Sequence, residues 1–154
     1  MTVSLADRIP KRAEPQRLPR AVEGEPGLFV VDGSWGIIAP LDLGRGVQTV
    51  GELEVIAHIA AGDQLIDTRL PEYVEQGTLE SARAIAHTEI EQRAGEVDRT
   101  RVAVLFCNGP QCPATPQAIE TLLSLGHPGE MLRFYRGGIH DWVTLGLPLA
   151  EPSA

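Results

Sequence analysis

The stretch RVAVLFCNGPQCPATPQAIETLLSLG, residues 101–126, decides the fold and contains both cysteines of the 154-residue chain. Its first six residues are mainly apolar and predict a buried strand, whereas residues 113–126 carry apolar side chains at helical spacing and end on Gly126. A loop rich in glycine and proline lies between them. Cys107 therefore falls where a buried strand ends and a helix begins, which is where open α/β sheets usually bind ligands.

Further strands and helices alternate around this stretch. QLIDTR (64–69) and MLRFY (131–135) each predict a short buried strand. TVGE (49–52) and TEIE (88–91) have the spacing of helix capping boxes. This alternation predicts an α/β fold with a parallel central sheet flanked by helices on both faces. The residues predicted to form the apolar face of the helix after TVGE are Leu53, Ile56, Ala57 and Ala60.

The N-terminal part of the chain differs in composition. Residues 1–26 contain four prolines among charged residues and predict a flexible segment, which leaves residues 27–154 as a single domain. Within that domain, Asp32-Gly33 stands between two apolar runs, a pattern typical of a two-residue hairpin. We therefore expect an N-terminal β-hairpin extension before the sheet.

The formal charge of −8 at pH 7 is unevenly distributed. Residues 1–45 are balanced, but residues 46–154 carry fifteen Asp and Glu against seven Lys and Arg. An acidic body repels a phosphate backbone, so we expect no nucleic-acid partner. No apolar run approaches the roughly 20 residues that span a bilayer, and the N-terminus lacks the apolar stretch of a signal peptide. We therefore expect no membrane association and a cytoplasmic location.

A reducing cytoplasm disfavours a structural disulfide, which leaves catalytic, redox or metal-binding roles for two close cysteines. The four histidines share no ligand spacing with the cysteines, so we expect no metal site and no cofactor. A structural alternative is that both cysteines are small buried hydrophobes, which is a common role of free cysteine.

The loop can stabilise an anion on Cys107. A turn from strand to helix points successive backbone amides toward its centre, and the helix dipole adds partial positive charge. Pro110 and Pro113 have no amide hydrogen, so the predicted donors are the amides of Asn108, Gly109, Gln111 and Cys112. Lowering a thiol pKa from about 8.5 to about 6.5 would ionise most of the sulfur at pH 7. Cys107 is thus the predicted nucleophile and the more reactive thiol.

Three motifs in order resemble the rhodanese, or sulfurtransferase, family. LIDTRLPEYVEQGTLESARAIAH (65–87) is similar to the family's strand with Asp and Arg and the segments after it. VLFCNGPQC (104–112) resembles the strand and cysteine loop, and RGGIHDWVTLGLPL (136–149) resembles the closing Gly-Gly, Trp and Gly-x-Pro signature. The resemblance covers about residues 47–150 and implies a rhodanese-like fold.

The resemblance also implies an activity, in which Cys107 takes a sulfur atom from a donor and becomes a persulfide. The implied partners are a small-molecule or protein persulfide donor and a thiol acceptor. Asp67 and Arg69 match the family's strand-end pair, which an ion pair bracing the loop would explain equally well. Arg136 precedes the Gly-Gly and can face the pocket or the solvent. The loop that would cradle the sulfur comprises Asn108, Gly109, Pro110, Gln111 and Cys112.

Departures from the family pattern bear on the substrate. Many active members have arginine directly after the cysteine and again at the sixth loop position, where this chain has Asn108 and Cys112. Without these cations, thiosulfate is predicted to be a poor donor. A Cys-x-Gly-Pro-x-Cys loop also occurs in part of the family. Cysteine phosphatases share the general loop design but need an arginine six residues after the cysteine, where this chain has Pro113.

The predicted function is therefore that of a sulfurtransferase or persulfide carrier that uses Cys107. Two alternatives stay open. One is a thiol redox protein in which Cys112 resolves an oxidised Cys107 as a disulfide. The other is a non-catalytic rhodanese-like binding or regulatory module. The sequence sets no expectation for the oligomeric state.

Overall fold

The computed structural model describes residues 19–30 and 39–152, and its centre is a five-stranded sheet. The strands are β3 (Gln48–Val50), β4 (Gln64–Asp67), β5 (Arg83–Ala84), β6 (Ala103–Phe106) and β7 (Leu132–Tyr135). They lie in the order β3-β7-β6-β4-β5, and every neighbouring pair is parallel. The predicted parallel α/β sheet is confirmed, with β6 as its central strand.

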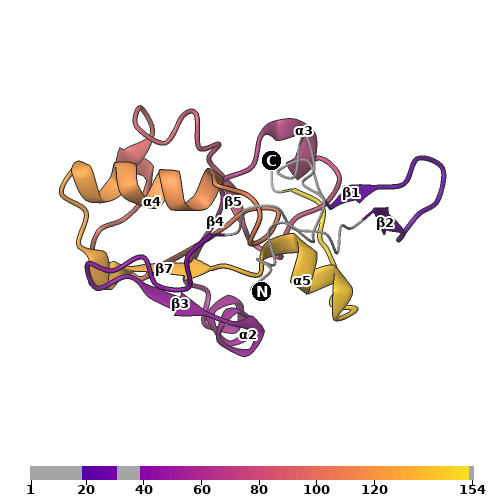
Figure 1. The fold of residues 1–154 in the computed structure, drawn as a ribbon, viewed down its shortest axis with the longest axis horizontal. Helices are drawn as coiled ribbons and strands as arrows, with labels where there is room; N and C mark the ends of the chain where they lie inside the picture. The colour runs from indigo at the N-terminus through magenta and orange to yellow at the C-terminus, as the bar shows by residue number, and fades with distance from the viewer. Residues whose placement is uncertain (1–18, 31–38, 153–154) are drawn as a thin grey trace, which may run out of the picture.

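Helices cover both faces of this sheet. The helices are α2 (Glu52–Ala61), α3 (Pro71–Val74), α4 (Ala114–Ser124) and α5 (Gly138–Thr144), with two 3₁₀ turns, η2 (Ala94–Glu96) and η3 (Gly129–Met131). Figure 1 shows α4 on one side of the sheet and α2 on the other. Among the described residues, no helix has the length and apolar character required to cross a bilayer.

The core consists of two layers because successive side chains of a strand point to opposite faces. Ala103 and Leu105 of β6 pack in the layer under α4, whereas Val104 and Phe106 pack in the layer that contains Trp142 of α5. These four residues of β6 are at most 1% exposed. A strand buried on both faces reads as a continuous apolar run, which is why β6 was predictable from the sequence.

The first predicted capping box is wrong by two residues. Thr49 belongs to β3, where it pairs with Phe134 of β7, so it cannot begin a helix. The helix instead has Gly51 as its N-cap, and the Glu54 carboxylate accepts a hydrogen bond from the Gly51 amide. The N-terminal end of α2 is therefore capped two positions further along the chain than TVGE suggested.

The apolar face predicted for α2 is also wrong. The four residues predicted to form its apolar face are exposed: Leu53, Ile56, Ala57 and Ala60. Val55 and His58 are buried instead. The segment ELEVIAHIAA is apolar on most of its surface, so its periodicity does not select the buried side. His58 tolerates burial because its Nε2 contacts the carbonyl oxygen of Gln64.

The second predicted helix start, at residues 88–91, is wrong as well. These residues form turns that lead into η2. The amide of His87 donates to the carbonyl of Thr68, which ties the segment to the end of β4, and Ile90 is buried under α4. These tertiary contacts outweigh the local helix signal of TEIE.

An antiparallel ribbon precedes the sheet, in which β1 (Arg20–Ala21) pairs with β2 (Phe29–Val30). Its turn lies at residues 22–28, where the Val22 amide donates to the carbonyl of Leu28. The turn predicted at Asp32-Gly33 lies outside the described residues. The amide of Ala21 donates to Oε1 of Gln76, which attaches the ribbon near α3 (Figure 1). The domain boundary at residue 26 stays a prediction, and β1 lies before it.

Candidate active site

Cys107 directly follows β6 and is 1% exposed, and the loop after it leads into α4. The neighbouring strand β4 ends at Asp67, which pairs with Phe106. Cys107 therefore lies at the carboxyl edge of the sheet and at a strand-to-helix turn, where the sequence placed it.

The start of α5 orients the loop backbone. The amide of Ile139 donates to the carbonyl of Cys107 (3.1 Å), and the amide of His140 donates to the carbonyl of Asn108 (2.8 Å). In a trans peptide the carbonyl and the next amide point in opposite directions. The amides of Asn108 and Gly109 are thus turned toward the cysteine sulfurs, to which both donate hydrogen bonds.

Gly138 makes this close approach of α5 to the loop sterically feasible. Its φ is +59°, and a Cβ added there would lie 2.3 Å from the carbonyl oxygen of Cys107. A larger residue would clash with backbone atoms that cannot move away easily. The Gly-Gly motif at residues 137–138 therefore has a direct structural role at the cysteine loop.

The sulfur of Cys107 is surrounded by neutral hydrogen-bond donors. Burial opposes its ionisation, but hydrogen bonds from the Cys112 thiol, from the Thr115 hydroxyl and amide, and from the Gly109 amide outweigh that effect. Together they lower the pKa of Cys107 to about 7. The carbonyl oxygens of Gly109 and Cys112 lie 3.9 and 3.6 Å from the same sulfur. When Cys107 is a thiol, its S–H can donate a hydrogen bond to either oxygen.

The second cysteine behaves in the opposite way. The pKa of Cys112 is raised, first because its thiol hydrogen-bonds to Cys107 and then because it is buried. The amides of Ala114 and Asn108 donate to its sulfur and only partly offset these effects. The two sulfurs thus share one hydrogen bond, in which Cys112 is the donor and Cys107 the acceptor. No disulfide joins them.

The predicted nest of amides is only partly right. The Gly109 amide does contact the Cys107 sulfur, but the amide of Cys112 closes a turn by donating to the carbonyl of Gly109 (3.0 Å). Thr115, in the first turn of α4, supplies the remaining donors. A helix offers its first amides freely because they have no partner within the helix.

Alkylation with iodoacetamide should modify Cys107 well before Cys112. We expect the rate at Cys107 to rise with pH and to reach half its maximum near pH 7, because the thiolate is the nucleophile and the pKa of Cys107 is about 7. Cys112 should stay unmodified over the same range, because its pKa is raised. Peptide mass spectrometry at each pH measures both sites. A Cys107 midpoint at or above the ordinary thiol value of about 8.5 would contradict this prediction.

Asp67 and Arg69 form a buried ion pair rather than a solvent-facing site. Nη2 of Arg69 lies 2.7 Å from Oδ2 of Asp67 and 2.7 Å from the carbonyl of Gly77. The Thr78 hydroxyl donates to the same carboxylate oxygen (2.7 Å), and the Arg69 amide donates to Oδ1 (3.0 Å). The geometry favours the bracing role, since the pair joins the end of β4 to residues 77–78.

Arg136 is also engaged by the backbone. Its Nε and Nη2 both donate to the carbonyl of Ala39, at 2.9 and 2.8 Å. The amide of Ala39 in turn donates to the carbonyl of Pro110 in the cysteine loop. Arg136 therefore supports the loop from outside through Ala39, in addition to the support from α5.

A cavity of about 360 Å³ opens beside the loop on the side of Cys112. Its wall includes apolar groups from α3 and α4, and its lining residues are Arg69, Leu70, Tyr73, His87, Asn108, Cys112, Pro113, Ala114 and Gln117. Burial lowers the pKa of His87, so its imidazole is neutral at pH 7. Arg69 is paired with Asp67, so among the described residues this cavity offers no uncompensated cation to an anionic ligand.

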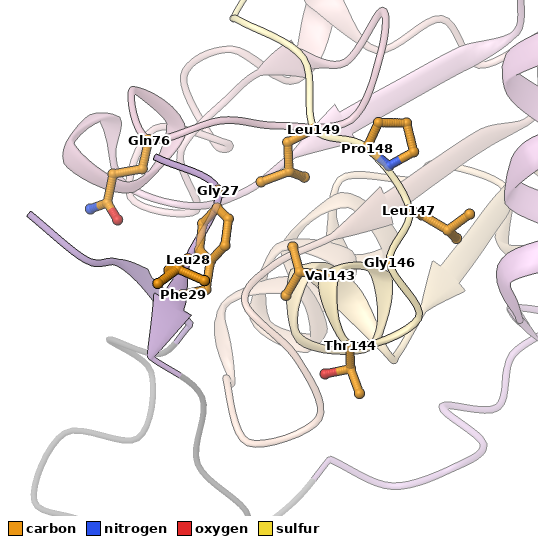
Figure 2. A pocket seen from close by; sticks show the side chains of 10 residues that line it. All are labelled: Gly27, Leu28, Phe29, Gln76, Val143, Thr144, Gly146, Leu147, Pro148 and Leu149. Carbon is orange, nitrogen blue, oxygen red and sulfur yellow. The ribbon is translucent and has the colours of Figure 1, made fainter. Parts of the chain in front are cut away.

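A second cavity, of about 620 Å³, lies between the β1–β2 ribbon and the end of α5. Figure 2 shows Phe29 of the ribbon on one side and Val143 and Leu149 on the other. None of the residues 107–112 lines this cavity. The candidate active site is therefore the smaller cavity beside the cysteines.

Sequence reasoning missed two polar residues outside the loop: Thr115, which hydrogen-bonds to the Cys107 sulfur, and Thr68, which hydrogen-bonds to Thr115. Thr115 lies beyond the cysteine motif. Thr68 lies between Asp67 and Arg69, and only these two charged residues were considered as candidates. The one available signal was position, because Thr68 directly follows the strand beside β6 and Thr115 lies in the first turn of the helix after the loop. Ile139 and His140 contact the loop through their backbone amides. The identity of their side chains therefore does not predict these contacts.

The fold and the site define a class of small α/β proteins with a buried cysteine at the end of the central strand of a parallel sheet. Within that class, the chain belongs to the rhodanese-like domain family, whose family model matches residues 52–145. The β1–β2 ribbon lies outside the matched residues. The family resemblance seen in the sequence is thus confirmed.

Two relatives show what kinds of protein contain similar sequences. The chain is 32% identical over 88 residues to a sulfurtransferase of Allochromatium vinosum, an alignment that covers 57% of this chain and 78% of the relative. It is 27% identical over 110 residues to an HTH-type transcriptional regulator of Mycobacterium tuberculosis, covering 71% of this chain and 47% of the regulator. The chain thus spans about half the length of that regulator.

Solved structures show the same fold. A rhodanese-like domain protein from Staphylococcus aureus superposes with a TM-score of 0.58 at 19% identity, covering 70% of this chain and 100% of that one. A human single-domain sulfurtransferase superposes with a TM-score of 0.53 at 26% identity, covering 64% and 97%. These superpositions agree with the family model in placing the fold of this chain among rhodanese-like domains.

Proposed function

We propose that this protein is a cytoplasmic sulfurtransferase that carries sulfane sulfur as a persulfide on Cys107. The observation that supports this most directly is the set of donors that converge on the Cys107 sulfur and lower its pKa to about 7. About half of the thiol is then ionised at neutral pH, which provides the nucleophile. The proposed partners are a persulfide donor, either a small molecule or a protein, and a thiol acceptor.

The reaction proceeds in two exchanges at sulfur. The Cys107 thiolate attacks the outer sulfur of a donor persulfide, R–S–SH, which releases R–S⁻ and leaves Cys107–S–SH. An acceptor thiolate then attacks the outer sulfur of that group, becomes the new persulfide and releases Cys107 as the thiolate. Each step exchanges one sulfur–sulfur bond for another, so no external oxidant or reductant is consumed.

The cavity beside the loop disfavours thiosulfate, a dianion, relative to donors that carry less negative charge. Arg69 is neutralised by Asp67, Arg136 is bound to the Ala39 carbonyl, and His87 is neutral. A hydrogen bond to a charged group contributes about 1.5–3 kcal/mol. Since the loop also lacks arginine, a sulfonate group gains little here that would offset the loss of its water.

We expect a persulfide such as cysteine persulfide to be used more efficiently than thiosulfate by roughly one to several powers of ten in kcat/KM. The assay measures sulfur transfer to dithiothreitol, with Cys107→Ser as the background. Gln117→Arg, which adds a cation at the exposed mouth of the cavity, should improve the use of thiosulfate and leave persulfide use unchanged. Equal use of both donors by the wild type would show that the argument from missing cations is wrong.

A thiol redox protein is a second candidate function, favoured by the hydrogen bond between the two cysteines. Hydrogen peroxide would oxidise Cys107 to the sulfenic acid and release water, and Cys112 would then form the disulfide and release a second water. Intact-mass analysis separates the two functions. A persulfide adds one sulfur atom, whereas a disulfide removes two hydrogens.

A regulatory module is the third candidate, favoured by the similarity to a transcriptional regulator. A purely structural role in such a module would not need the lowered pKa of Cys107. Absence of any persulfide or disulfide after exposure to sulfur donors and to peroxide would favour this candidate over the other two.

A further inference from the structure

A pair of hydroxyl groups leads from the Cys107 sulfur into the protein. Thr68 follows β4, Thr115 lies in the first turn of α4, and both are 0% exposed. Their hydroxyl oxygens lie 2.8 Å apart. The Thr68 hydroxyl also lies 3.0 Å from the carbonyl oxygen of Phe106, and the Thr115 hydroxyl hydrogen-bonds to the Cys107 sulfur.

The two hydroxyl oxygens lie 2.8 Å apart, so one hydrogen must lie between them, and this leaves the pair two arrangements. Each hydroxyl carries one hydrogen, and three acceptors compete for the two: the Phe106 carbonyl, the partner hydroxyl and the sulfur. When Cys107 is a thiol, Thr68 donates to Phe106 and Thr115 donates to Thr68. When Cys107 is a thiolate, Thr115 donates to the sulfur and Thr68 donates to Thr115.

Neither arrangement leaves a buried acceptor unsatisfied. When the Thr68 hydroxyl turns away from Phe106, the Phe106 carbonyl still accepts the Thr68 amide at 3.0 Å. The change therefore requires only rotation of two hydroxyl hydrogens, with no movement of heavy atoms. In the second arrangement the two hydrogen bonds polarise each other, which strengthens the donor that reaches the sulfur.

We propose that Thr115 is a catalytic residue whose hydroxyl holds the anionic sulfur of Cys107, and that Thr68 is a positioning residue that acts through it. The pair would act whenever Cys107 is a thiolate, both before it attacks a donor and after it gives up its sulfur. This proposal rests on Cys107 being the reactive sulfur of the proposed function.

Other titratable groups surround the loop on several elements. They are Cys112 in the loop, Asp67 at the end of β4, Arg69 and His87 in the segments after β4 and β5, and His140 and Asp141 in α5. Cys112 donates to the same sulfur as a neutral thiol, and Asp67 and Arg69 bind each other. The groups that lower the pKa of Cys107 are all neutral, so the Thr115 hydroxyl contributes through its dipole.

The test is the pH dependence of Cys107 alkylation by iodoacetamide in hydroxyl variants. Thr115→Val should raise the midpoint by about one to two pH units, because a hydrogen bond to a charged group is lost. Thr68→Val should raise it by a smaller amount. Thr115→Ser and Thr68→Ser keep the hydroxyl and should keep the midpoint near the wild-type value, which a merely structural role would not require.

A double variant tests whether the two hydroxyls act in series. If Thr68 acts only through Thr115, adding Thr68→Val to Thr115→Val causes no further shift of the midpoint. Additive shifts would overturn the positioning role of Thr68, and an unchanged midpoint in Thr115→Val would overturn the proposal as a whole. Should Thr115→Val fail to fold, Thr115→Ser and Thr115→Ala provide the same comparison, since they differ only in the hydroxyl.

The readout also separates this proposal from the proposed function. Alkylation reports the acidity of Cys107 whether or not sulfur is transferred. A wild type that shows the expected shifts but transfers no sulfur from any donor would count against the sulfurtransferase function and leave the role of the hydroxyl pair intact.

Discussion

Replacing Cys107 with serine is expected to reduce sulfur transfer from a persulfide donor by at least about a thousandfold, to the uncatalysed background. A serine hydroxyl is a far weaker nucleophile than a thiolate and cannot form a persulfide. The measurement is the rate of sulfur transfer to dithiothreitol, together with the intact mass of the protein after exposure to the donor. The variant should not gain the mass of one sulfur atom.

Cys112→Ser is the matched control for this prediction. It keeps a hydroxyl that can donate to the Cys107 sulfur in place of the Cys112 thiol, so persulfide formation on Cys107 should survive. The variant cannot form the intramolecular disulfide, so its sensitivity to peroxide should change. Sulfur transfer that persists in Cys107→Ser and is lost in Cys112→Ser would reverse the roles assigned to the two cysteines.

The largest effect on stability is expected at the buried ion pair. Arg69→Met should lower the free energy of unfolding by about 3–5 kcal/mol, because it leaves the Asp67 carboxylate buried without its cation. For a chain of this size, that corresponds to a fall in melting temperature of roughly 6–20 °C. Arg45→Met is the control, since the Arg45–Glu120 pair is exposed and its loss should leave the melting temperature nearly unchanged.

The double variant Asp67→Leu/Arg69→Met identifies the cause of that loss. Because neither charge remains buried alone, the double variant should be less destabilised than the sum of the two single variants. Thermal unfolding of all four proteins gives the coupling directly. Additive losses would mean that the ion pair contributes through packing alone and not through its charges.

Strands β4, β6 and β7 and the cysteine loop could be predicted because their signals are local, whereas β3 and β5 were not predicted. β6 is a run of four buried apolar residues that ends directly before Cys107, and α4 follows the loop with apolar side chains at helical spacing. The start and the buried face of α2 could not be predicted in the same way. Thr49 pairs with β7, which is distant in the sequence, and therefore belongs to a strand. The apolar residues of α2 lie on all sides of the helix, so the sequence does not show which side is buried.

Only part of the candidate site could be predicted from the sequence, because the rest depends on contacts between residues that are distant in the sequence. Residues 107–112 form a continuous motif, so their position could be read directly. The groups that complete the site come from three other elements: Thr68 from the end of β4, Thr115 from α4 and Ile139 from α5. Their contribution depends on how the sheet brings these elements together.

The contact between α5 and the loop has a consequence for the timing of biosynthesis. The loop is synthesised before Ile139 and His140, whose amides fix the direction of the loop carbonyls. Until that contact forms, α5 does not hold the Asn108 and Gly109 amides toward the sulfurs, and we expect the pKa of Cys107 to lie closer to that of an ordinary cysteine. We therefore expect the low pKa of Cys107 to develop only after α5 has docked against the loop, which places the activation of the thiol late in the synthesis of the domain.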